Sequence, residues 1–257
     1  MLKLTQISLL RDGKTVLDSI SASAPLGQLT SLLGLNAAGK SSLLAVAAGE
    51  LSPSGGEVLF DGLNVSQVPT EQLARRRAML PQSSTLHFDF SARDIALLGA
   101  APFPEIASNQ LPGLINSVLR LCSVYDLADC PYPQLSAGEQ RRTQLARVLV
   151  QACAAAAQGP AFLLLDEPTA CLDPYHQHVL LAGLQQLVRT LPLSVVASLQ
   201  DVNLALKYSD HAWLLRQGRL VASGPSCETL LPTQLNRVFP LHIRSTADAL
   251  LFSLPGS

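Results

Sequence analysis

The sequence has little charge and few aromatic side chains. Of its 257 residues, 14% are charged and 5% are aromatic, and the formal net charge is −1. Proteins that bind nucleic acid usually carry an excess of Lys and Arg that contacts phosphates, and no such excess is present here. The two basic runs, Arg75–Arg77 and Arg141–Arg142, are short, and we interpret them as solvated helix faces. Nucleic acid is therefore not an expected partner.

Long apolar runs are also missing, although 48% of the residues are hydrophobic. The longest runs, 148–157 and 161–165, are separated by a Gln-Gly-Pro turn, whereas a helix needs about 20 apolar residues to cross a bilayer. The N-terminus lacks the basic run, apolar stretch and cleavage site of a secretion signal. The mean hydropathy of +0.28 therefore indicates either an aliphatic core or apolar surface for partner subunits.

The cysteines follow no pairing pattern. They never form a C-x-x-C motif, which argues against a disulfide framework and against a structural zinc site. A reducing cytoplasm fits this usage best. The five cysteines are Cys122, Cys130, Cys153, Cys171 and Cys227.

What the sequence does contain is a series of strand and helix patterns. Short apolar runs at 161–165, 195–199 and 212–215 are typical of buried parallel strands. The first 30 residues favour strands joined by turns. Helical patterns dominate from about 83 to 157, where strand signals fade.

These patterns predict a single α/β domain over residues 1–257. Its core is formed by 1–82 and 159–257 and includes an antiparallel β region at the N-terminus. A helical subdomain at 83–158 is inserted into that core.

Residues 34–41 satisfy the pattern G-x-x-x-x-G-K-[ST], with an apolar strand before it and a helix after it. Glycines let the backbone N–H groups of such a loop surround phosphate oxygens, and the helix N-terminus adds positive potential. Lys40 would bind the β- and γ-phosphates, and the Ser41 hydroxyl would ligate Mg²⁺. The predicted nucleotide-binding residues of the loop are Gly34, Leu35, Asn36, Ala37, Ala38, Gly39, Lys40, Ser41 and Ser42.

Two acidic residues end the apolar run at 161–165. Asp166 is placed to hold Mg²⁺, and Glu167 can polarise an attacking water as general base. Ligands of open α/β sheets bind at the carboxyl ends of the strands, where both acids would lie. Two surface acids at a strand end are the alternative, which the phosphate loop in the same chain disfavours.

Residues 135–140, Leu-Ser-Ala-Gly-Glu-Gln, precede a predicted helix. These residues resemble the signature motif in the nucleotide-binding domains of ABC transporters. The phosphate loop and the acidic pair resemble the corresponding motifs of the same family. In this resemblance Gln82 corresponds to the glutamine that touches Mg²⁺ and the attacking water, and 169–173 corresponds to the D-loop. The resemblance covers nearly the whole chain and implies a P-loop NTPase (RecA-like) core.

The resemblance also implies an ATPase that works as a homodimer with ATP and Mg²⁺. Two copies would close head to tail, so that the signature of one copy contacts the ATP of the other. The implied contacts are Ser136, Ala137, Gly138, Glu139 and the D-loop residue Asp173. Two copies of a transmembrane permease and, indirectly, a periplasmic binding protein are the implied partners. The chain would then lie peripherally on the cytoplasmic face of a bacterial inner membrane.

The chain departs from the family pattern at several positions. Gln200 stands where the family usually has a histidine that contacts the γ-phosphate, and glutamine cannot carry a positive charge. We expect slower turnover, which Gln200→His should raise. Leu9 aligns with the aromatic residue that commonly stacks on adenine, although Leu9 could equally be core. Ala37 and Ala137 replace glycines, and we expect both to be tolerated.

A finer resemblance is to the ATPase subunits of importers for haem, siderophores and vitamin B12, and most to the haem branch. It rests on residues 88–91, 172–177 and 200–205. His176 and His178 could in principle ligate haem iron, but we favour ordinary helix positions for both.

Other functions remain open at this point. One is an ABC ATPase of DNA repair or translation, which would usually carry tandem domains or basic extensions. Another is a regulatory subunit with weak hydrolysis, against which the intact Lys40, Asp166 and Glu167 argue. We expect the permease to dock around 82–90 and 100–105. Leu86, Phe88 and Phe90 are the candidate apolar contacts.

Overall fold

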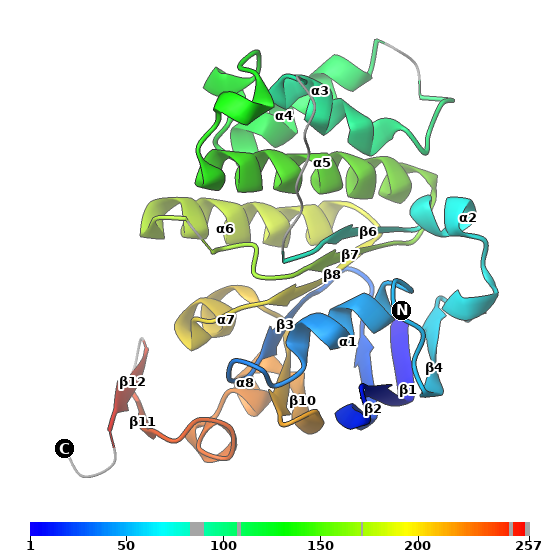
Figure 1. The fold of residues 1–257 in the computed structure, drawn as a ribbon. Coiled ribbons are helices and arrows are strands. Elements are labelled where there is room, and N and C mark those ends of the chain that lie inside the picture. The colour runs from blue at the N-terminus through cyan, green and yellow to red at the C-terminus, as the bar shows by residue number, and fades with distance from the viewer. Residues whose placement is uncertain (83–89, 107–108, 171, 247–248, 255–257) are drawn as a thin grey trace.

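Two large β-sheets, a two-stranded C-terminal hairpin and layers of helix make up the described part of the fold (Figure 1). The computed structural model describes residues 1–82, 90–106, 109–170, 172–246 and 249–254. Within these residues the central sheet has six strands, all parallel except β10 at one edge. In spatial order they are β10 (Arg219–Pro225), β9 (His211–Arg216), β3 (Leu29–Leu33), β8 (Leu193–Ser198), β7 (Ala161–Leu165) and β6 (Arg77–Leu80).

A second, antiparallel sheet is built mainly from the N-terminal residues, as the sequence predicts. Helix α1 (Lys40–Ala47) lies between the two sheets, and its buried face joins a core cluster to which both sheets contribute. Phe60 and Phe162 stack across this core with ring centroids 4.5 Å apart. The strands of the second sheet are β2 (Lys14–Ala24), β1 (Leu2–Arg11), β4 (Gly55–Phe60) and β5 (Leu63–Asn64).

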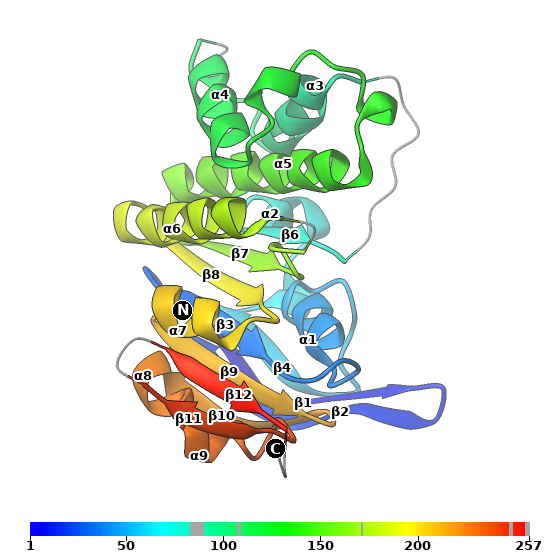
Figure 2. The same cartoon turned by 90° about the vertical axis from the view of Figure 1, so that its left-hand side faces the viewer.

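Helices cover the other face of the central sheet. The long helices α5 (Ala137–Gln158) and α6 (Pro174–Thr190) lie on the sheet, and α3 (Ala92–Leu97) and α4 (Leu111–Leu121) lie beyond α5 (Figure 2). The largest hydrophobic cluster runs from the sheet through α5 into α4. Helix α5 is thus packed against the central sheet on one side and against α3 and α4 on the other. The predicted division of the chain at 83 and 158 remains a prediction from the sequence.

The remaining helices and strands are short. Asn203 holds the C-terminal hairpin, since its side chain donates to the Leu250 carbonyl at 3.1 Å and accepts from the Leu250 N–H at 2.8 Å. The α-helices and strands concerned are α2 (Thr70–Ala74), α7 (Val202–Tyr208), α8 (Ser226–Thr229), α9 (Pro232–Leu235), β11 (His242–Ser245) and β12 (Leu250–Ser253). Single 3₁₀ turns span Val65–Gln67, Leu98–Ala100, Tyr125–Leu127 and Tyr132–Gln134.

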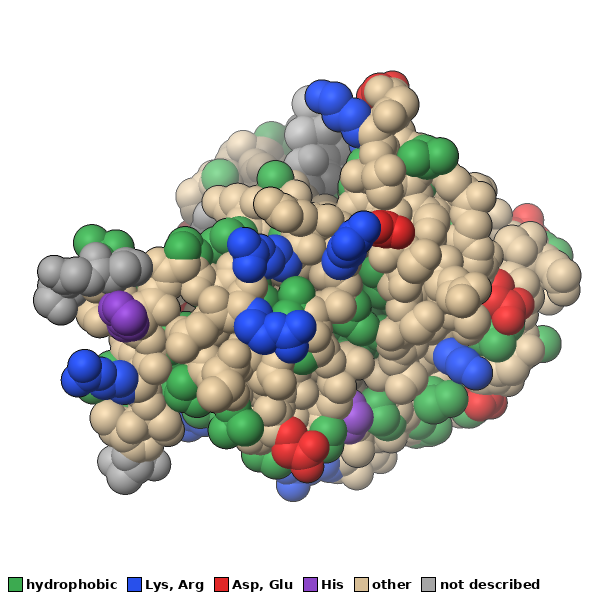
Figure 3. Space-filling view, turned by 90° about the horizontal axis from the view of Figure 1, so that it is seen from below, with side chains coloured by type: hydrophobic (Ala, Val, Ile, Leu, Met, Phe, Trp, Pro, Cys, Tyr) green, Lys and Arg blue, Asp and Glu red, His purple; other side chains and the backbone are tan. Residues whose placement is uncertain are grey.

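The surface agrees with the low charge of the sequence. On the face seen from below, basic and acidic side chains are interspersed with hydrophobic ones (Figure 3). Among the described residues, no helix has both the length and the apolar character needed to cross a bilayer.

The interpretation of the basic runs as solvated helix faces is wrong for Arg77 and Arg141, which bind backbone carbonyls, whereas Arg75 stays partly exposed in a surface ion pair. Arg75 binds the Glu105 carboxylate and the Pro102 carbonyl, and Arg77 Nε donates to the Ala48 carbonyl at 2.6 Å. Arg141 donates to two backbone carbonyls of the core. The periodicity of a sequence does not reveal such long-range backbone acceptors, which explains the error.

Candidate active site

The predicted site residues follow four neighbouring strands and lie along one edge of the central sheet, where the carboxyl ends of these strands meet. The phosphate loop follows β3, Gln82 follows β6, the acidic pair follows β7, and Gln200 follows β8. Because these strands are parallel, their carboxyl ends point to the same edge. The order β3, β8, β7, β6 therefore gathers segments that are far apart in the chain.

Two glycines shape the phosphate loop. A Cβ on Gly34 would lie 2.3 Å from the Leu215 carbonyl oxygen, so any side chain there would collide with backbone. Gly39 has φ +103°, a conformation that L side chains rarely adopt, and it caps the N-terminus of α1. Ala37 also has a positive φ of 60°, so alanine takes up the left-handed turn at this position.

Lys40 is the buried cation of this loop. Its Nζ donates to the Gly34 carbonyl at 2.8 Å and to the Leu35 carbonyl at 3.1 Å, and the residue is only 7% exposed. Burial lowers the pKa of the Lys40 amine, and the nearby carboxylates of Glu167 and Asp166 oppose this shift. A cation held beside carboxylates at a helix N-terminus suits a phosphate that is also bound to a divalent cation.

A cavity of about 450 Å³ opens over the loop. Predicted residues from three segments meet there, because the phosphate loop, Gln82 and Glu167 all contribute to its wall. Gly34 and Leu35 contribute through their carbonyls to Lys40, and Ala38 is buried in the core. The cavity is lined by Val16, Asn36, Ala37, Gly39, Lys40, Ser41, Ser42, Gln82 and Glu167.

The acidic pair is fixed by a serine that the sequence analysis missed. Ser198, at the end of β8, is fully buried, and its hydroxyl donates to Asp166 Oδ1 at 2.7 Å. The same hydroxyl accepts from the Glu167 N–H at 2.7 Å. Glu167 has φ +50°, so its backbone turns sharply just after the buried strand. A polar residue at the end of an apolar run was the available signal for Ser198, but strand order was needed to interpret it.

The residues at this edge fit a magnesium ion. Asp166 is only 1% exposed, although a buried carboxylate is costly unless a cation or hydrogen bonds compensate it. Carboxylate, hydroxyl and amide oxygens are the ligands that Mg²⁺ prefers. Asp166, the Ser41 hydroxyl and the Gln82 side chain are the candidates for holding it.

The signature residues lie outside this cavity, at the beginning of α5. Ser136 caps the helix and forms a capping box with Glu139. The Ser136 hydroxyl donates to Glu139 Oε2 at 2.7 Å, and the Ser136 N–H donates to the same oxygen at 2.8 Å. These bonds hold the pKa of Glu139 below its usual value. Ser136 and Ala137 are exposed, and Gly138 is half-buried.

Gln200 and Asp173 also lie outside the cavity wall. Gln200 is exposed two residues after the end of β8, and Asp173 caps α6 by accepting from the His176 N–H at 3.0 Å. The His176 ring contacts Asp173 at 2.6 Å, whereas the His178 ring contacts the Tyr208 hydroxyl at 2.7 Å. The two rings therefore serve different neighbours.

Of the two roles that the sequence left open for Leu9, adenine stacking or core, the structure gives it the core. Leu9 is 7% exposed and belongs to the core cluster beneath α1. Val16, from β2, lines the cavity, and Leu9 does not. Both residues are apolar, so the sequence could not tell which one faced the site.

The comparisons with known proteins agree with this geometry. The family model described as ABC transporter matches residues 17–170. The chain belongs to the ABC transporter family. As a member of it, the chain is an ATP-binding subunit whose ATP hydrolysis drives transport, and the predicted P-loop NTPase core is confirmed.

Individual ABC relatives extend the match to nearly the full chain. A protein of Bordetella parapertussis named hemin import ATP-binding protein HmuV is 42% identical over 257 residues, which cover 99% of this chain and 97% of the relative. A protein of the same name from Photobacterium damsela subsp. piscicida is 40% identical over 238 residues, covering 93% and 88%.

Solved ABC structures share the fold. An ATP-binding subunit of an ABC transporter superposes with a TM-score of 0.79 at 20% identity, covering 93% of this chain and 94% of that one. The dimeric bacterial ABC transporter cassette MJ0796 superposes with a TM-score of 0.76 at 21% identity, covering 88% and 99%.

Proposed function

We propose that the chain is the ATP-hydrolysing subunit of a bacterial inner-membrane importer for haem. The observation that carries the substrate assignment is the identity of 40–42% to hemin import ATP-binding proteins along nearly the whole chain. The equivalent subunit of a siderophore or vitamin B12 importer is the alternative. The protein would lie on the cytoplasmic face of the membrane, and two copies would serve two permease subunits and, indirectly, a periplasmic binding protein.

The site geometry supports the following division of labour. Lys40 and the N–H groups that begin α1 bind the phosphates. Asp166, Ser41 and Gln82 would hold Mg²⁺, which neutralises phosphate charge when bound. Glu167, which lines the cavity, orients a water and accepts its proton.

The second copy of the chain supplies the rest of the site in this proposal. Ser136 and Ala137 are exposed at the start of α5 and do not line the chain's own cavity. A helix N-terminus of this kind favours an anion. We therefore assign these residues, with Gly138, Glu139 and Asp173, to the nucleotide of the opposite copy.

The permease docks, we propose, in an apolar hollow of about 480 Å³ in the helical layer. Phe90 lines this hollow and is 41% exposed. Leu86 and Phe88, the other expected contacts, lie outside the described residues. The lining residues are Phe90, Asp94, Leu97, Leu98, Ala100, Ala101, Phe103, Pro104, Ile106 and Leu111.

Transport by the assembled complex tests the substrate. The chain is reconstituted in liposomes with its permease and binding protein, and ATP-dependent uptake of haem, a ferric siderophore and vitamin B12 is measured. We expect haem uptake, and loss of uptake with Glu167→Gln, which removes the general base but leaves nucleotide binding. Uptake of another cargo without haem uptake would overturn the substrate assignment, and absent ATPase activity would leave a regulatory subunit.

A substitution in the hollow tests the docking site. Phe90→Glu places a charge on the apolar lining and should abolish uptake while ATP binding stays intact. Phe252→Glu is the matched control, because Phe252 is 39% exposed on the C-terminal hairpin, away from the hollow. Wild-type uptake by Phe90→Glu would exclude this docking site.

A further inference from the structure

Arg141 connects the start of α5 to two segments of the active site. One terminal nitrogen of its guanidinium, Nη1, donates to the Pro81 carbonyl, and the other, Nη2, donates to the Asp166 carbonyl. Pro81 immediately precedes Gln82, and Asp166 immediately precedes Glu167. We propose that Arg141 is a positioning residue that couples the signature end of α5 to the catalytic segments of its own subunit. This inference rests on the proposed function.

The position of Arg141 in the helix places its two contacts close to the signature residue Ser136. It lies in the second turn of α5, five residues after the N-cap Ser136. In the proposed dimer, Ser136 contacts the nucleotide of the opposite copy, while the Arg141 guanidinium holds the segments that carry Gln82 and Glu167. One short stretch of helix therefore touches both nucleotide sites of the dimer.

Arginine is suited to this role by its shape. Its planar fork presents two donors at a fixed separation, so it holds two carbonyls at a set distance from each other. Those two carbonyls belong to the residues that directly follow the neighbouring strands β6 and β7. Lysine offers one compact charge and cannot reproduce the fork, and glutamine keeps a donor without the charge.

The rest of α5 is anchored to the core at a second place. Gln151 Nε2 donates to the Ala74 carbonyl at 2.9 Å and to the carbonyl of Arg77, the first residue of β6, at 3.2 Å. These bonds fix the later part of α5 beside β6. A displacement at the start of the helix would therefore change the distances between the Arg141 guanidinium and the two carbonyls that it binds. Closure of the second copy onto Ser136 would thereby adjust Gln82 and Glu167.

The variants Arg141→Gln and Arg141→Lys test the proposal in the full-length protein. Three quantities are measured: the dissociation constant for ATP with a fluorescent analogue, kcat, and the Hill coefficient of the ATPase rate against ATP concentration. For Arg141→Gln we expect kcat to fall about tenfold or more and the Hill coefficient to approach 1. ATP affinity should change less than twofold. Arg141→Lys should recover part of kcat, since it keeps one charged donor.

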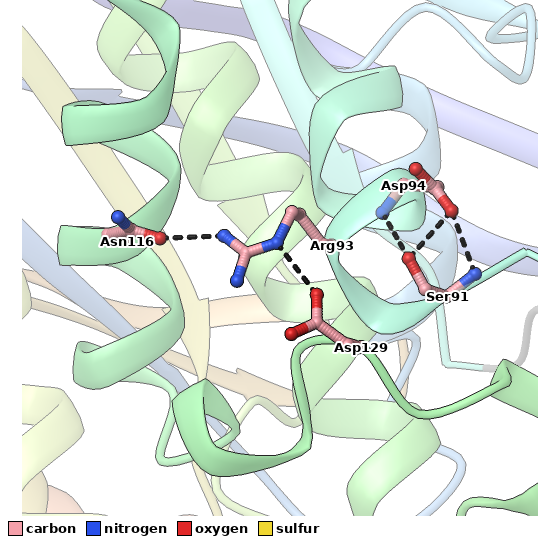
Figure 4. A network of polar contacts seen from close by, with 5 residues as sticks. All are labelled: Ser91, Arg93, Asp94, Asn116 and Asp129. Atoms are coloured by element: carbon pink, nitrogen blue, oxygen red, sulfur yellow. Dashed lines mark hydrogen bonds and ion pairs between the residues drawn. The ribbon is translucent and has the colours of Figure 1, made fainter.

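Arg93 provides a matched control in the helical layer (Figure 4). Its Nε donates to Asp129 at 3.1 Å and its Nη1 donates to Asn116 at 2.7 Å, so it too joins separate segments through a guanidinium. It touches neither strand end. Arg93→Gln should leave kcat and the Hill coefficient unchanged.

Two results would overturn the proposal. One is a wild-type kcat and Hill coefficient in Arg141→Gln. The other is a loss of kcat in Arg141→Gln that is matched by equal losses of ATP affinity and thermal stability, as a merely structural role requires. Absence of ATPase activity in the wild-type protein would instead count against the proposed function.

Discussion

The edge of the central sheet and the start of α5 hold their functional groups in different ways. At the sheet edge, burial holds the functional groups in place, since Asp166 is 1% exposed and its partner Ser198 is fully buried. At the start of α5, Ser136 is exposed and is held only by the local capping box with Glu139. Groups for the chain's own nucleotide are thus fixed by the core. Groups that we assign to the second copy are fixed locally and stay accessible to it.

Among the substitutions that test this comparison, Ser136→Ala should lower ATPase activity the most. The change removes the cap and, in the proposed dimer, a donor to a charged phosphate. A hydrogen bond to a charged group is worth about 1.5–3 kcal/mol, so ATPase activity should fall about 10- to 100-fold. Loss of the cap should cost about 0.5–2 kcal/mol of folding free energy. Steady-state ATPase assays and urea unfolding measure the two losses separately.

Ser91 provides the control, because it forms the same capping box at the start of α3. Its hydroxyl donates to Asp94 Oδ2 at 2.6 Å and accepts from the Asp94 N–H at 3.1 Å (Figure 4). Ser91→Ala should cost a similar folding free energy with ATPase activity within twofold of wild type. Equal ATPase losses in the two variants would show that the cap alone matters at Ser136.

Ser198→Ala tests the buried side of the comparison. Without the hydroxyl, Asp166 loses a donor and the Glu167 N–H loses its acceptor, which costs about 1–3 kcal/mol. We expect kcat to fall roughly tenfold, since about 1.4 kcal/mol corresponds to a factor of ten. Ser194→Ala in the same strand is the matched control.

Ser194 is equally buried, but its hydroxyl has no hydrogen-bond partner among the described residues. Removing that hydroxyl should leave kcat unchanged and the free energy of unfolding unchanged or slightly raised. A similar kcat for Ser198→Ala and Ser194→Ala would mean that the bridge between Asp166 and Glu167 does not position them.

Much of the site could be predicted from the sequence because its motifs are local. The phosphate loop depends on glycines at fixed spacing, and both Gly34 and Gly39 meet the geometric demand that the motif implies. The acidic pair follows a run of five buried residues, which identifies the strand end. Local chemistry at a strand end needs no knowledge of the neighbouring strands.

The rest of the site depends on contacts between distant segments. Ser198 meets Asp166 only because β8 lies beside β7, and Arg141 meets Pro81 across 60 residues of chain. Val16 reaches the cavity, whereas Leu9 turns into the core, because of how β1 and β2 pair. No pattern within one segment specifies strand order or long-range acceptors.

Gln200→His should change kcat less than the serine substitutions do, and it should raise kcat where they lower it. Gln200 is exposed at the carboxyl end of β8, where a histidine could supply positive charge to the γ-phosphate and a glutamine cannot. We expect kcat to rise a few-fold with little change in ATP affinity. An unchanged or lower kcat in steady-state assays would contradict the expectation that Gln200 slows turnover.

The pH dependence of stability should show the smallest effect. The bonds from Ser91 hold the pKa of Asp94 below its ordinary value near 3.9. The folded state therefore favours the carboxylate, and this contribution is present above about pH 4 and is lost as the pH falls through the lowered pKa. The difference in unfolding free energy between wild type and Asp94→Asn should be constant from about pH 7 to 5 and shrink below about pH 4. Ser91→Ala should remove only the part that comes from the hydroxyl, because the backbone N–H of residue 91 still donates to Asp94. A difference between wild type and Asp94→Asn that stays constant down to about pH 3 would show that the capping box contributes nothing through the charge of Asp94.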